Sequence, residues 1–281
     1  MRILVTGAGG MLGRDVVRAA ERAGHDAIAL PRPELDVTDA AAVFERVADA
    51  RPDAIVNCAA YTDVDGAERD PEAAMRVNAE GAGIAAAAAA AARARVVYLS
   101  SDYVFDGAKG APYLESDEPG PLSAYGRSKL AGERATAEAT PRHLVVRSSW
   151  LFGTGGRNFV ETMLSLGRER GELRVVTDQV GCPTYTPHLA AGLVDLIEAG
   201  ALGTCHVAGG GACSWFEFAV EILSRAGVAA LVEPCASEEL PRPAPRPAYS
   251  ALGSERPDAP RLPHWTAGLA AYFVERGAVP A

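Results

Sequence analysis

A tyrosine and a lysine four residues apart are the residues of this chain best suited to acid–base chemistry. Tyr125 and Lys129 stand in the sequence YGRSK, and on a helix this spacing places both side chains on one face. A free tyrosine has a pKa of about 10, so a nearby ammonium group is needed to make it a useful proton donor at neutral pH. The alternative is an exposed helical tyrosine beside a solvated lysine.

A serine upstream adds a third polar group to this pair. Ser101 lies 24 residues before Tyr125 and follows an apolar run at residues 96–100. Side chains at the carboxyl ends of parallel strands face the crevice in which ligands bind, so Ser101 is a candidate hydrogen-bond donor to a substrate carbonyl oxygen. A serine that only ends a strand would have the same sequence context.

The sequence GAGGMLG at residues 7–13 has the glycine spacing of a dinucleotide site between a strand and a helix. Gly7 and Gly10 permit a tight turn and the close approach of a pyrophosphate to the helix N-terminus, and Gly13 permits close packing of helix and strand. This pattern predicts a nicotinamide dinucleotide as the cofactor.

The end of the second expected strand bears on which cofactor is used. It reads ALPRP, without the carboxylate that would bind the ribose 2′-hydroxyl of NADH, and Arg32 stands there to face a 2′-phosphate. We therefore predict NADPH, with NADH as a possible substitute. The alternative is a solvated Arg32 in an enzyme that takes either cofactor. Asp36 lies just beyond, within reach of the adenine.

Apolar runs alternate with helical stretches through the first 150 residues. Strands are expected at residues 2–6, 25–30, 54–59, 96–100 and 143–148, and helices at 11–23, 40–50 and 82–92. Apolar strands separated by helices are typical of a parallel sheet covered on both faces. The sequence thus predicts an α/β fold with a Rossmann-type doubly wound parallel sheet.

The alternation changes after about residue 150. Helices are expected at residues 158–169, 187–199 and 214–225, and a strand at 173–177. We expect residues 1–150 to form a dinucleotide-binding domain, to which elements at about 178–207 return. Residues 151–177 and 208–281 would form a smaller C-terminal α/β substrate-binding cap. The proline-rich stretch 239–247 predicts either a stiff loop beside a pocket or a polyproline ligand for a partner domain.

Composition narrows the classes of partner. The 27 basic and 36 acidic residues give a net charge of −9, which argues against general binding to nucleic acids or anionic membranes. Residues 82–92 are too few and too weakly apolar to span a bilayer, and the N-terminal apolar run is too short for a secretory signal. Neither the five cysteines nor the five histidines have metal-ligand spacing. We expect a cytoplasmic protein without a metal, a monomer or weak homodimer.

Taken together, these motifs resemble the extended short-chain dehydrogenase/reductases and, within them, the dTDP-4-dehydrorhamnose reductase family. Three narrow motifs carry the resemblance: SSDYVFDG at residues 100–107, RSSW at 147–150 and DQVGCPT at 178–184. The glycine and tyrosine–lysine motifs belong to the whole superfamily. The resemblance covers most of the chain and implies the NADPH-dependent reduction of the 4-keto group of dTDP-4-dehydro-6-deoxy-L-mannose to dTDP-L-rhamnose.

The resemblance also implies roles for individual residues. Tyr125 corresponds to the proton donor, Lys129 to its partner that also holds the nicotinamide ribose, and Ser101 to the hydroxyl of the trio. Besides the residues already named, the implied cofactor contacts are Met11, Leu12, Val37, Ala59, Ala60, Tyr61, Asn78 and Ser100. With Ser101 and Tyr125, the implied substrate contacts are Thr62, Val64, Asp102, Tyr103, Trp150, Asn158, Gln179, Thr184 and Arg246.

Some features leave other functions open. Certain relatives form a dimer bridged by a metal on carboxylates, but here the helix after the PT motif has no acid before Asp195, which disfavours such a bridge. The sugar remains open, since the same scaffold also reduces related dTDP-keto-deoxysugars such as dihydrostreptose-type precursors. A non-catalytic regulatory subunit resembling methionine adenosyltransferase β is a further alternative. A nucleotide-sugar epimerase is disfavoured by the missing acid after the second strand.

Overall fold

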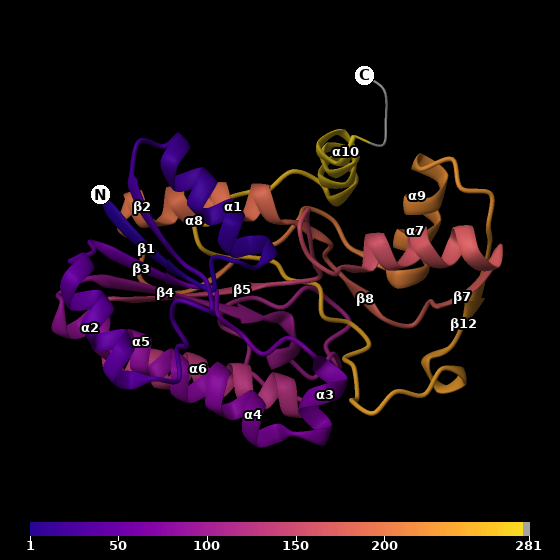
Figure 1. Cartoon of the computed structure of the whole chain (residues 1–281). Coiled ribbons are helices and arrows are strands. Elements are labelled where there is room, and N and C mark those ends of the chain that lie inside the picture. The colour runs from indigo at the N-terminus through magenta and orange to yellow at the C-terminus, as the bar shows by residue number, and fades with distance from the viewer. Residues whose placement is uncertain (278–281) are drawn as a thin grey trace.

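A six-stranded parallel sheet forms the centre of the computed structural model, which describes residues 1–277 (Figure 1). The strand order is β10-β5-β4-β3-β1-β2. The strands are β1 (Arg2–Thr6), β2 (Asp26–Leu30), β3 (Ala54–Asn57), β4 (Arg95–Ser101), β5 (His143–Ser148) and β10 (Gly203–His206). All four residues of β3 are buried, because helices cover both faces of the sheet, and this explains why the strands have apolar runs rather than alternation.

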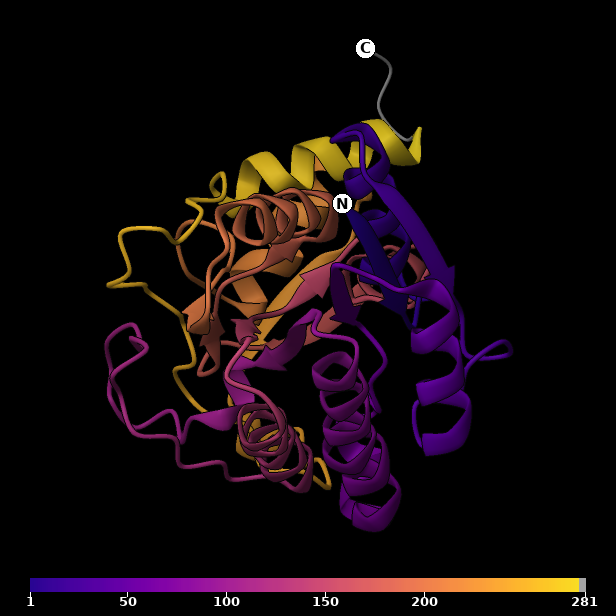
Figure 2. The ribbon, with the colours of Figure 1, turned by 90° about the vertical axis from the view of Figure 1, so that its left-hand side faces the viewer.

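Five long helices cover the two faces of this sheet (Figures 1 and 2). They are α1 (Met11–Arg22) and α8 (Thr186–Ala199) on one face, and α2 (Ala40–Ala50), α5 (Gly81–Ala91) and α6 (Ala124–Ala139) on the other. Val16 and Leu189 belong to the core under α1, whereas Val43 and Ala86 belong to the core under α2. The predicted doubly wound α/β fold is therefore confirmed. Within residues 1–277, no helix has the length and apolar character needed to cross a bilayer.

Short helical segments connect β3 to α5. They are α3 (Val64–Arg69), α4 (Pro71–Met75) and the π-helical turn η1 (Arg76–Glu80). Asp63 caps α3 by accepting a hydrogen bond from the Gly66 amide at 2.8 Å. Within the wider π-turn, the carbonyl of Asn78 accepts a hydrogen bond from the Tyr98 hydroxyl at 2.8 Å. This bond joins the turn to the centre of the sheet.

Most of the remaining elements gather beyond the carboxyl ends of the strands (Figure 1). They are η2 (Asp102–Val104), β6 (Leu151–Phe152), α7 (Phe159–Arg170), β7 (Glu172–Val176), β8 (Val180–Gly181), β9 (Thr184–Tyr185), β11 (Cys213–Ser214), α9 (Trp215–Arg225), β12 (Leu231–Cys235), η3 (Ser237–Glu239) and α10 (Trp265–Arg276). A second hydrophobic core forms among them around Phe152, Phe218 and Tyr272. We propose that residues 151–177 and the chain from residue 208, which supply most of this core, form the substrate-binding part. Within the returning stretch 178–207, β10 joins the main sheet and α8 covers it.

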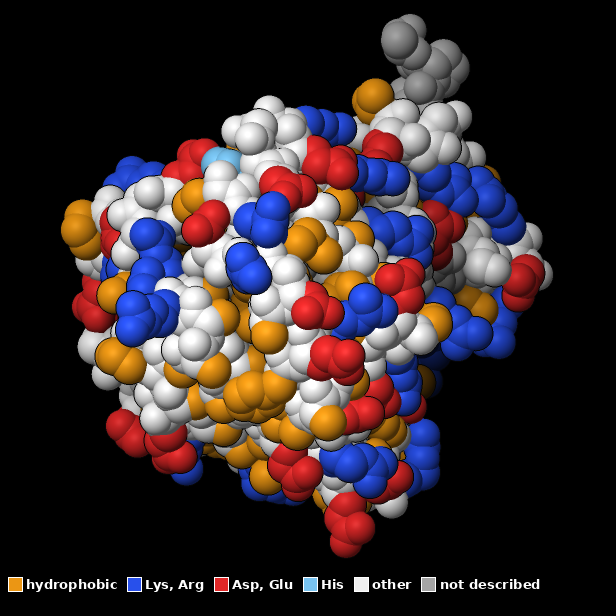
Figure 3. All heavy atoms as spheres, turned by 60° about the vertical axis from the view of Figure 1, so that its left-hand side comes forward, with side chains coloured by type: hydrophobic (Ala, Val, Ile, Leu, Met, Phe, Trp, Pro, Cys, Tyr) orange, Lys and Arg blue, Asp and Glu red, His pale blue; other side chains and the backbone are white. Residues whose placement is uncertain are grey.

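A hollow of about 590 Å³ lies at the opposite edge, where the strands begin. Figure 3 turns the left-hand side of Figure 1 forward and shows hydrophobic side chains gathered among charges of both signs. Arg51 directly follows the carboxyl end of α2, Arg93 lies two residues beyond that of α5, and both line the hollow. A helix carboxyl end carries a partial negative charge, so these arginines compensate helix dipoles. The guanidinium of Arg142 likewise donates to the Arg93 carbonyl at 2.7 Å.

Candidate active site

Ser101, Tyr125 and Lys129 converge where α6 passes the carboxyl end of β4. Ser101 is the last residue of β4, and the other two lie in the first two turns of α6. The Ser101 side chain lies near enough to the Tyr125 phenol to lower the pKa of that group, and Lys129 Nζ donates to the Leu99 carbonyl at 2.5 Å. The structure thus places a hydroxyl, a phenol and an amine at the edge of the sheet where ligands of this fold bind.

Close packing of α6 fixes where the tyrosine and lysine stand. Ser123 caps the helix by accepting a hydrogen bond from the Gly126 amide at 3.1 Å. A Cβ atom at Gly126 would lie 2.2 Å from the Tyr103 carbonyl oxygen, and one at Gly132 would lie 2.0 Å from that of Asn78. Both glycines are therefore needed for the helix to approach η2 and η1 this closely.

Burial controls the protonation of the pair. It raises the pKa of Tyr125 to about 12, although the nearby Ser101 side chain acts in the opposite direction. It lowers the pKa of Lys129 to about 7, which the nearby Glu133 carboxylate counteracts. The phenol therefore carries its proton at neutral pH, as a proton donor must. The amine is close to the balance between its charged and neutral forms.

Asp102, next to the trio, is surrounded by serine hydroxyls and is only 2% exposed. Ser101 Oγ donates to Asp102 Oδ1 at 3.0 Å, while the hydroxyls of Ser149 and Ser250 donate to Oδ2 at 3.1 and 2.5 Å. Burial raises the pKa of this carboxyl to about 6. Through the first of these bonds, Asp102 orients the Ser101 side chain. A direct contact between Asp102 and the substrate remains a prediction.

The glycine turn opens α1 at the point where the strand order reverses between β1 and β3. Gly7 has a φ of +63°, and a Cβ atom there would lie 2.6 Å from the Ala59 amide nitrogen. A Cβ at Gly13 would lie 2.4 Å from the Gly7 carbonyl oxygen, whereas one at Gly10 meets nothing closer than 3.4 Å. No side chain caps α1. The space beside Gly10 therefore gives a ligand access to the N-terminus of α1, whose amides have no side-chain cap. Such a helix N-terminus suits an anionic pyrophosphate.

Two arginines lie near the end of β2. Arg32 is exposed in the loop after the strand, and Asp36 follows it. Asp36 accepts hydrogen bonds from the Thr38 amide and hydroxyl, which lower the pKa of its carboxyl, and the charges of Arg32 and Arg76 add to this effect. Arg76, in η1, was not predicted from the sequence, because an arginine in a helical stretch resembles any solvated one.

Asn78, also in η1, holds the chain that follows β3. Its Oδ1 accepts from the Tyr61 amide at 2.8 Å, and its Nδ2 donates to the Tyr61 carbonyl at 3.0 Å and to Ser128 Oγ at 2.9 Å. The half-buried residues Ala59 and Ala60 lie in the same segment. Asn78 is itself fully buried, so it supports this segment from behind.

Other residues predicted to contact the cofactor have side chains turned into the protein. Leu12 and Val37 are buried apolar residues, and the Ser100 hydroxyl donates to Glu133 at 2.5 Å. Only backbone atoms of these three residues are left for a cofactor contact. Met11 is half-buried, and a Cβ atom at Gly156 would lie 2.4 Å from its side chain.

A cavity of about 480 Å³ opens beside Tyr103. Its lining includes Gln179, Trp215 and Arg246. Trp150 has a φ of +48°, a strained value for a bulky residue, and its ring stacks on Trp215 with centroids 3.4 Å apart. Gln179 donates to the Ser237 hydroxyl at 2.8 Å. The structure thus brings four of the predicted substrate residues to one region.

Four further residues predicted to contact the substrate are placed differently. Thr184 is fully buried, and its hydroxyl donates to the Cys182 carbonyl at 3.0 Å, so the structure does not bring it to the cavity. Asn158 caps α7 through the Glu161 amide. Thr62 is exposed and Val64 is half-buried at the start of α3.

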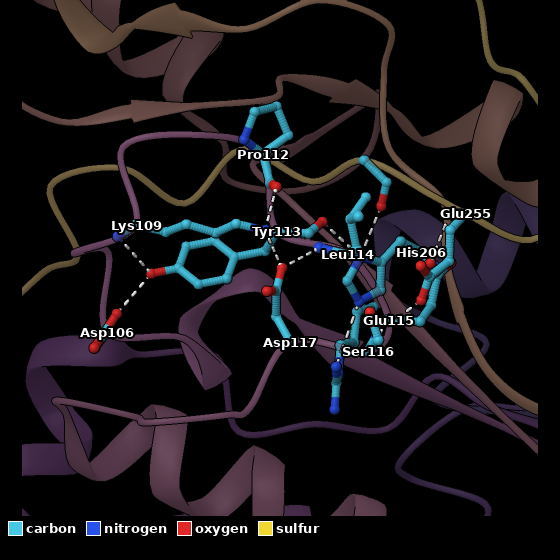
Figure 4. A network of polar contacts seen from close by, with 12 residues as sticks. Asp106, Lys109, Pro112, Tyr113, Leu114, Glu115, Ser116, Asp117, His206 and Glu255 are labelled. Carbon is cyan, nitrogen blue, oxygen red and sulfur yellow. Dashed lines mark hydrogen bonds and ion pairs between the residues drawn. The ribbon is translucent and has the colours of Figure 1, made fainter.

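A polar network braces the loop that follows Ser101 (Figure 4). The Tyr113 hydroxyl donates to Asp106 at 2.6 Å, and the His206 amide donates to Glu115 at 2.8 Å. Nδ1 of His206 lies 2.9 Å from the Gly253 carbonyl, which requires a proton on that nitrogen. These bonds tie the loop to β10 and to the chain near Gly253. Within residues 1–277, no three His, Cys, Asp or Glu side chains are grouped as metal ligands.

A doubly wound sheet with a glycine turn at its first strand–helix junction and a serine–tyrosine–lysine trio at its carboxyl edge defines a short-chain dehydrogenase/reductase. The family model described as RmlD substrate binding domain matches residues 1–277. The chain belongs to this family, that of the dTDP-4-dehydrorhamnose reductases, and it is an oxidoreductase. The resemblance seen in the sequence motifs is therefore confirmed.

Individual relatives are similar over most of their length. The dTDP-4-dehydrorhamnose reductase of Mycolicibacterium smegmatis is 45% identical over 259 residues, which are 91% of this chain and 79% of that protein. The crystal structure of a Clostridium acetobutylicum dTDP-4-dehydrorhamnose reductase matches with a TM-score of 0.96 and 41% identity, over 99% of this chain and 100% of that one. The Bacillus anthracis enzyme in complex with NADP matches with a TM-score of 0.94 and 40% identity, over 98% and 99%.

Proposed function

We propose that this protein uses NADPH to reduce the 4-keto group of dTDP-4-dehydro-6-deoxy-L-mannose to dTDP-L-rhamnose, with Tyr125 as the proton donor. The convergence of Ser101, Tyr125 and Lys129 between the glycine turn and the cavity carries this proposal. The names of the relatives support the dTDP-sugar, and the NADP complex supports the cofactor.

The glycine turn and the residues near it can bind each part of NADPH. When bound, NADPH supplies the hydride that reduces the carbonyl carbon. The amides at the start of α1 would hold its pyrophosphate, and Arg32 with Arg76 would hold its 2′-phosphate. Lys129 would hold the nicotinamide ribose, and hydrogen bonding to the anionic or polar groups there would favour its charged form.

Ser101, Tyr125 and Lys129 then supply the proton that the reduced carbonyl oxygen needs. Tyr125 gives its proton to the carbonyl oxygen as negative charge develops there, which is favourable because an alkoxide is a stronger base than a phenolate. In this step the Ser101 hydroxyl would turn its single proton from Asp102 Oδ1 to the same carbonyl oxygen, and such a donor contributes about 10²–10³ to the rate. The ammonium of Lys129 stabilises the phenolate that remains. One hydride and one proton convert the ketone to the alcohol.

The cavity has groups for each part of a nucleotide-linked sugar. The stacked rings of Trp150 and Trp215 offer an aromatic face for a base or a sugar ring. Arg174, Arg242 and Arg246 line the same cavity and suit the two phosphates. This pairing of aromatic and cationic side chains favours a nucleoside diphosphate sugar over a small neutral ketone.

The test is NADPH oxidation, followed by its absorbance, with dTDP-4-dehydro-6-deoxy-L-mannose generated in situ and the product identified as dTDP-L-rhamnose. NADH is run in parallel. We expect Tyr125→Phe to reduce turnover by about 10²–10⁴ while the NADPH Kd stays within about twofold. Tyr249→Phe, which removes a hydroxyl outside the trio, is the control. Turnover by Tyr125→Phe within about threefold of wild type would refute the role of Tyr125.

The same assay separates the alternatives. Oxidation of NADPH with a different dTDP-keto-deoxysugar, and not with the rhamnose precursor, would change the substrate but keep the trio. A folded protein that binds NADPH without turning over any of these sugars would favour the regulatory subunit.

A further inference from the structure

A proline-rich strap, defined as residues 240–247, forms one wall of the cavity beside Tyr103. Its fixed φ angles make it stiff, and its prolines have no amide hydrogen to donate. The Ala244 amide donates to Asp65 Oδ1 at 3.1 Å, and Arg246 Nη1 donates to the same oxygen at 2.7 Å. One carboxylate from α3 therefore holds a strap that lies about 180 residues further along the chain.

Asp65 stands on an element that also supports the helix of the catalytic tyrosine. It is the second residue of α3, and Glu68 of the same helix accepts a hydrogen bond from the Ala124 amide at 2.5 Å. Ala124 directly precedes Tyr125 at the start of α6. Helix α3 therefore links the position of the strap to that of the proton donor.

Arg246, at the end of the strap, lies on the side that faces the cavity. The guanidinium is mostly buried, with 13% of the side chain exposed, and Nη1 also donates to the Ala244 carbonyl at 2.7 Å. It lies beside the side chain of Tyr103, whose ring meets that of Tyr125 edge to face with centroids 5.8 Å apart. Arginine has five N–H donors, so those on Nε and Nη2 are left for a phosphate.

We propose that Asp65 is a positioning residue that closes the strap over the cavity and aims Arg246 at the diphosphate of the substrate. The inference rests on the proposed function, because that function supplies the diphosphate. Asp65 does not touch the reacting atoms in this scheme. It acts by restricting Arg246 to one place, so that less conformational freedom is lost when the substrate binds. Arg242, whose Nη1 lies 3.7 Å from Asp65 Oδ2, adds a weaker contact at the exposed side.

Kinetics of Asp65 variants test the proposal. We expect Asp65→Ala to raise the KM for the dTDP-sugar about tenfold, with kcat within about threefold of wild type and the NADPH Kd within about twofold. Asp65→Asn keeps an oxygen acceptor for the Ala244 amide, so it should recover part of the loss and serves as the folded variant if the alanine protein is unstable. The matched control is Asp26→Ala, which removes an exposed aspartate paired with Arg2 at the far end of the sheet.

A double-mutant cycle separates positioning from a general loss of stability. In an Arg246→Ala background, Asp65→Ala should raise KM by less than about twofold, because the residue it positions is gone. Hydrogen exchange at the Ala244 amide should accelerate in Asp65→Ala and not in Asp26→Ala. Equal KM increases with and without Arg246, or wild-type exchange at Ala244, would overturn the proposal.

Failure of the proposed function is distinguishable from failure of this inference. If wild-type protein reduces no dTDP-keto-sugar, the proposed function fails, and the dTDP Kd replaces KM in the cycle. Weaker dTDP binding by Asp65→Ala, lost in the Arg246→Ala background, would still support the positioning role. Unchanged dTDP binding would overturn it.

Discussion

Replacing Lys129 with methionine should make the protein more stable and nearly inactive. The amine is 2% exposed, and its nearest partners are the Leu99 carbonyl and the face of the Tyr98 ring, 4.4 Å from its centroid. Neither partner carries a full negative charge. Burial thus lowers the pKa of Lys129 to about 7, from 10.5 in its ordinary state. A residue kept at such a cost to stability is expected to serve activity.

The pH dependence of the unfolding free energy gives the size of the stability difference between wild type and Lys129→Met. Between pH 7 and pH 10.5 the unfolded chain holds the Lys129 proton and the folded chain does not, so wild-type stability increases with pH across this window. Methionine does not titrate, so the stability advantage of Lys129→Met is greatest below pH 7 and shrinks above it. From about pH 6 to pH 9 the advantage should fall by about 2.5 kcal/mol, from about 1.4 kcal/mol per pKa unit over nearly two units. For a chain of this size that is about 5 °C in Tm.

Thermal unfolding of wild type and Lys129→Met at both pH values measures this change. The methionine leaves the Leu99 carbonyl without the lysine, but that loss is the same at both pH values and cancels in the comparison. Lys109→Met is the matched control, because Lys109 is the other lysine of the chain and is paired with Asp117 near the surface. A Tm difference between Lys129→Met and wild type that is equal at both pH values would refute the desolvation of this amine.

Three further substitutions test the surroundings of the trio. Arg32→Ala should lower the preference for NADPH over NADH about tenfold in kcat/KM, and an unchanged ratio would remove Arg32 from the cofactor site. Gly132→Ala should lower the free energy of unfolding in urea by about 2–3 kcal/mol, because its Cβ would lie 2.0 Å from the Asn78 carbonyl oxygen; wild-type stability would contradict this packing. Glu133→Gln should cost about 3–5 kcal/mol, since it leaves the buried guanidinium of Arg147, now 2.7 Å from Glu133, without a counter-charge. A loss below about 1 kcal/mol would show that water or another group replaces the carboxylate.

Much of the fold is encoded locally. The five strands expected in the first 150 residues all form, at nearly the expected bounds, because a strand buried on both faces must be apolar throughout. The helix at 40–50 was predicted with its observed limits, Asp39 being a good cap before an amphipathic run. The glycine turn and the spacing of Tyr125 and Lys129 depend on one strand–helix junction and one helix, so these too could be recognised from short stretches.

The surroundings of the site were decided by tertiary structure. Arg76 approaches Asp36 only because η1 follows the short helices, and Asp65 meets Arg246 only because the strap returns to α3. Asp102 and Thr184 stand in the motifs that identified the family, yet the folded chain surrounds both with protein hydrogen-bond partners.

The physical reason lies in the range of the interactions. Helix and strand preferences act within a few residues, and the sequence by itself determined the sheet, the glycine turn and the trio that such preferences position. A hydrogen bond between residues far apart in the chain exists only after the backbone has been folded around it. Which polar groups face the cavity, and which are used to hold it in shape, was therefore settled by the tertiary structure alone.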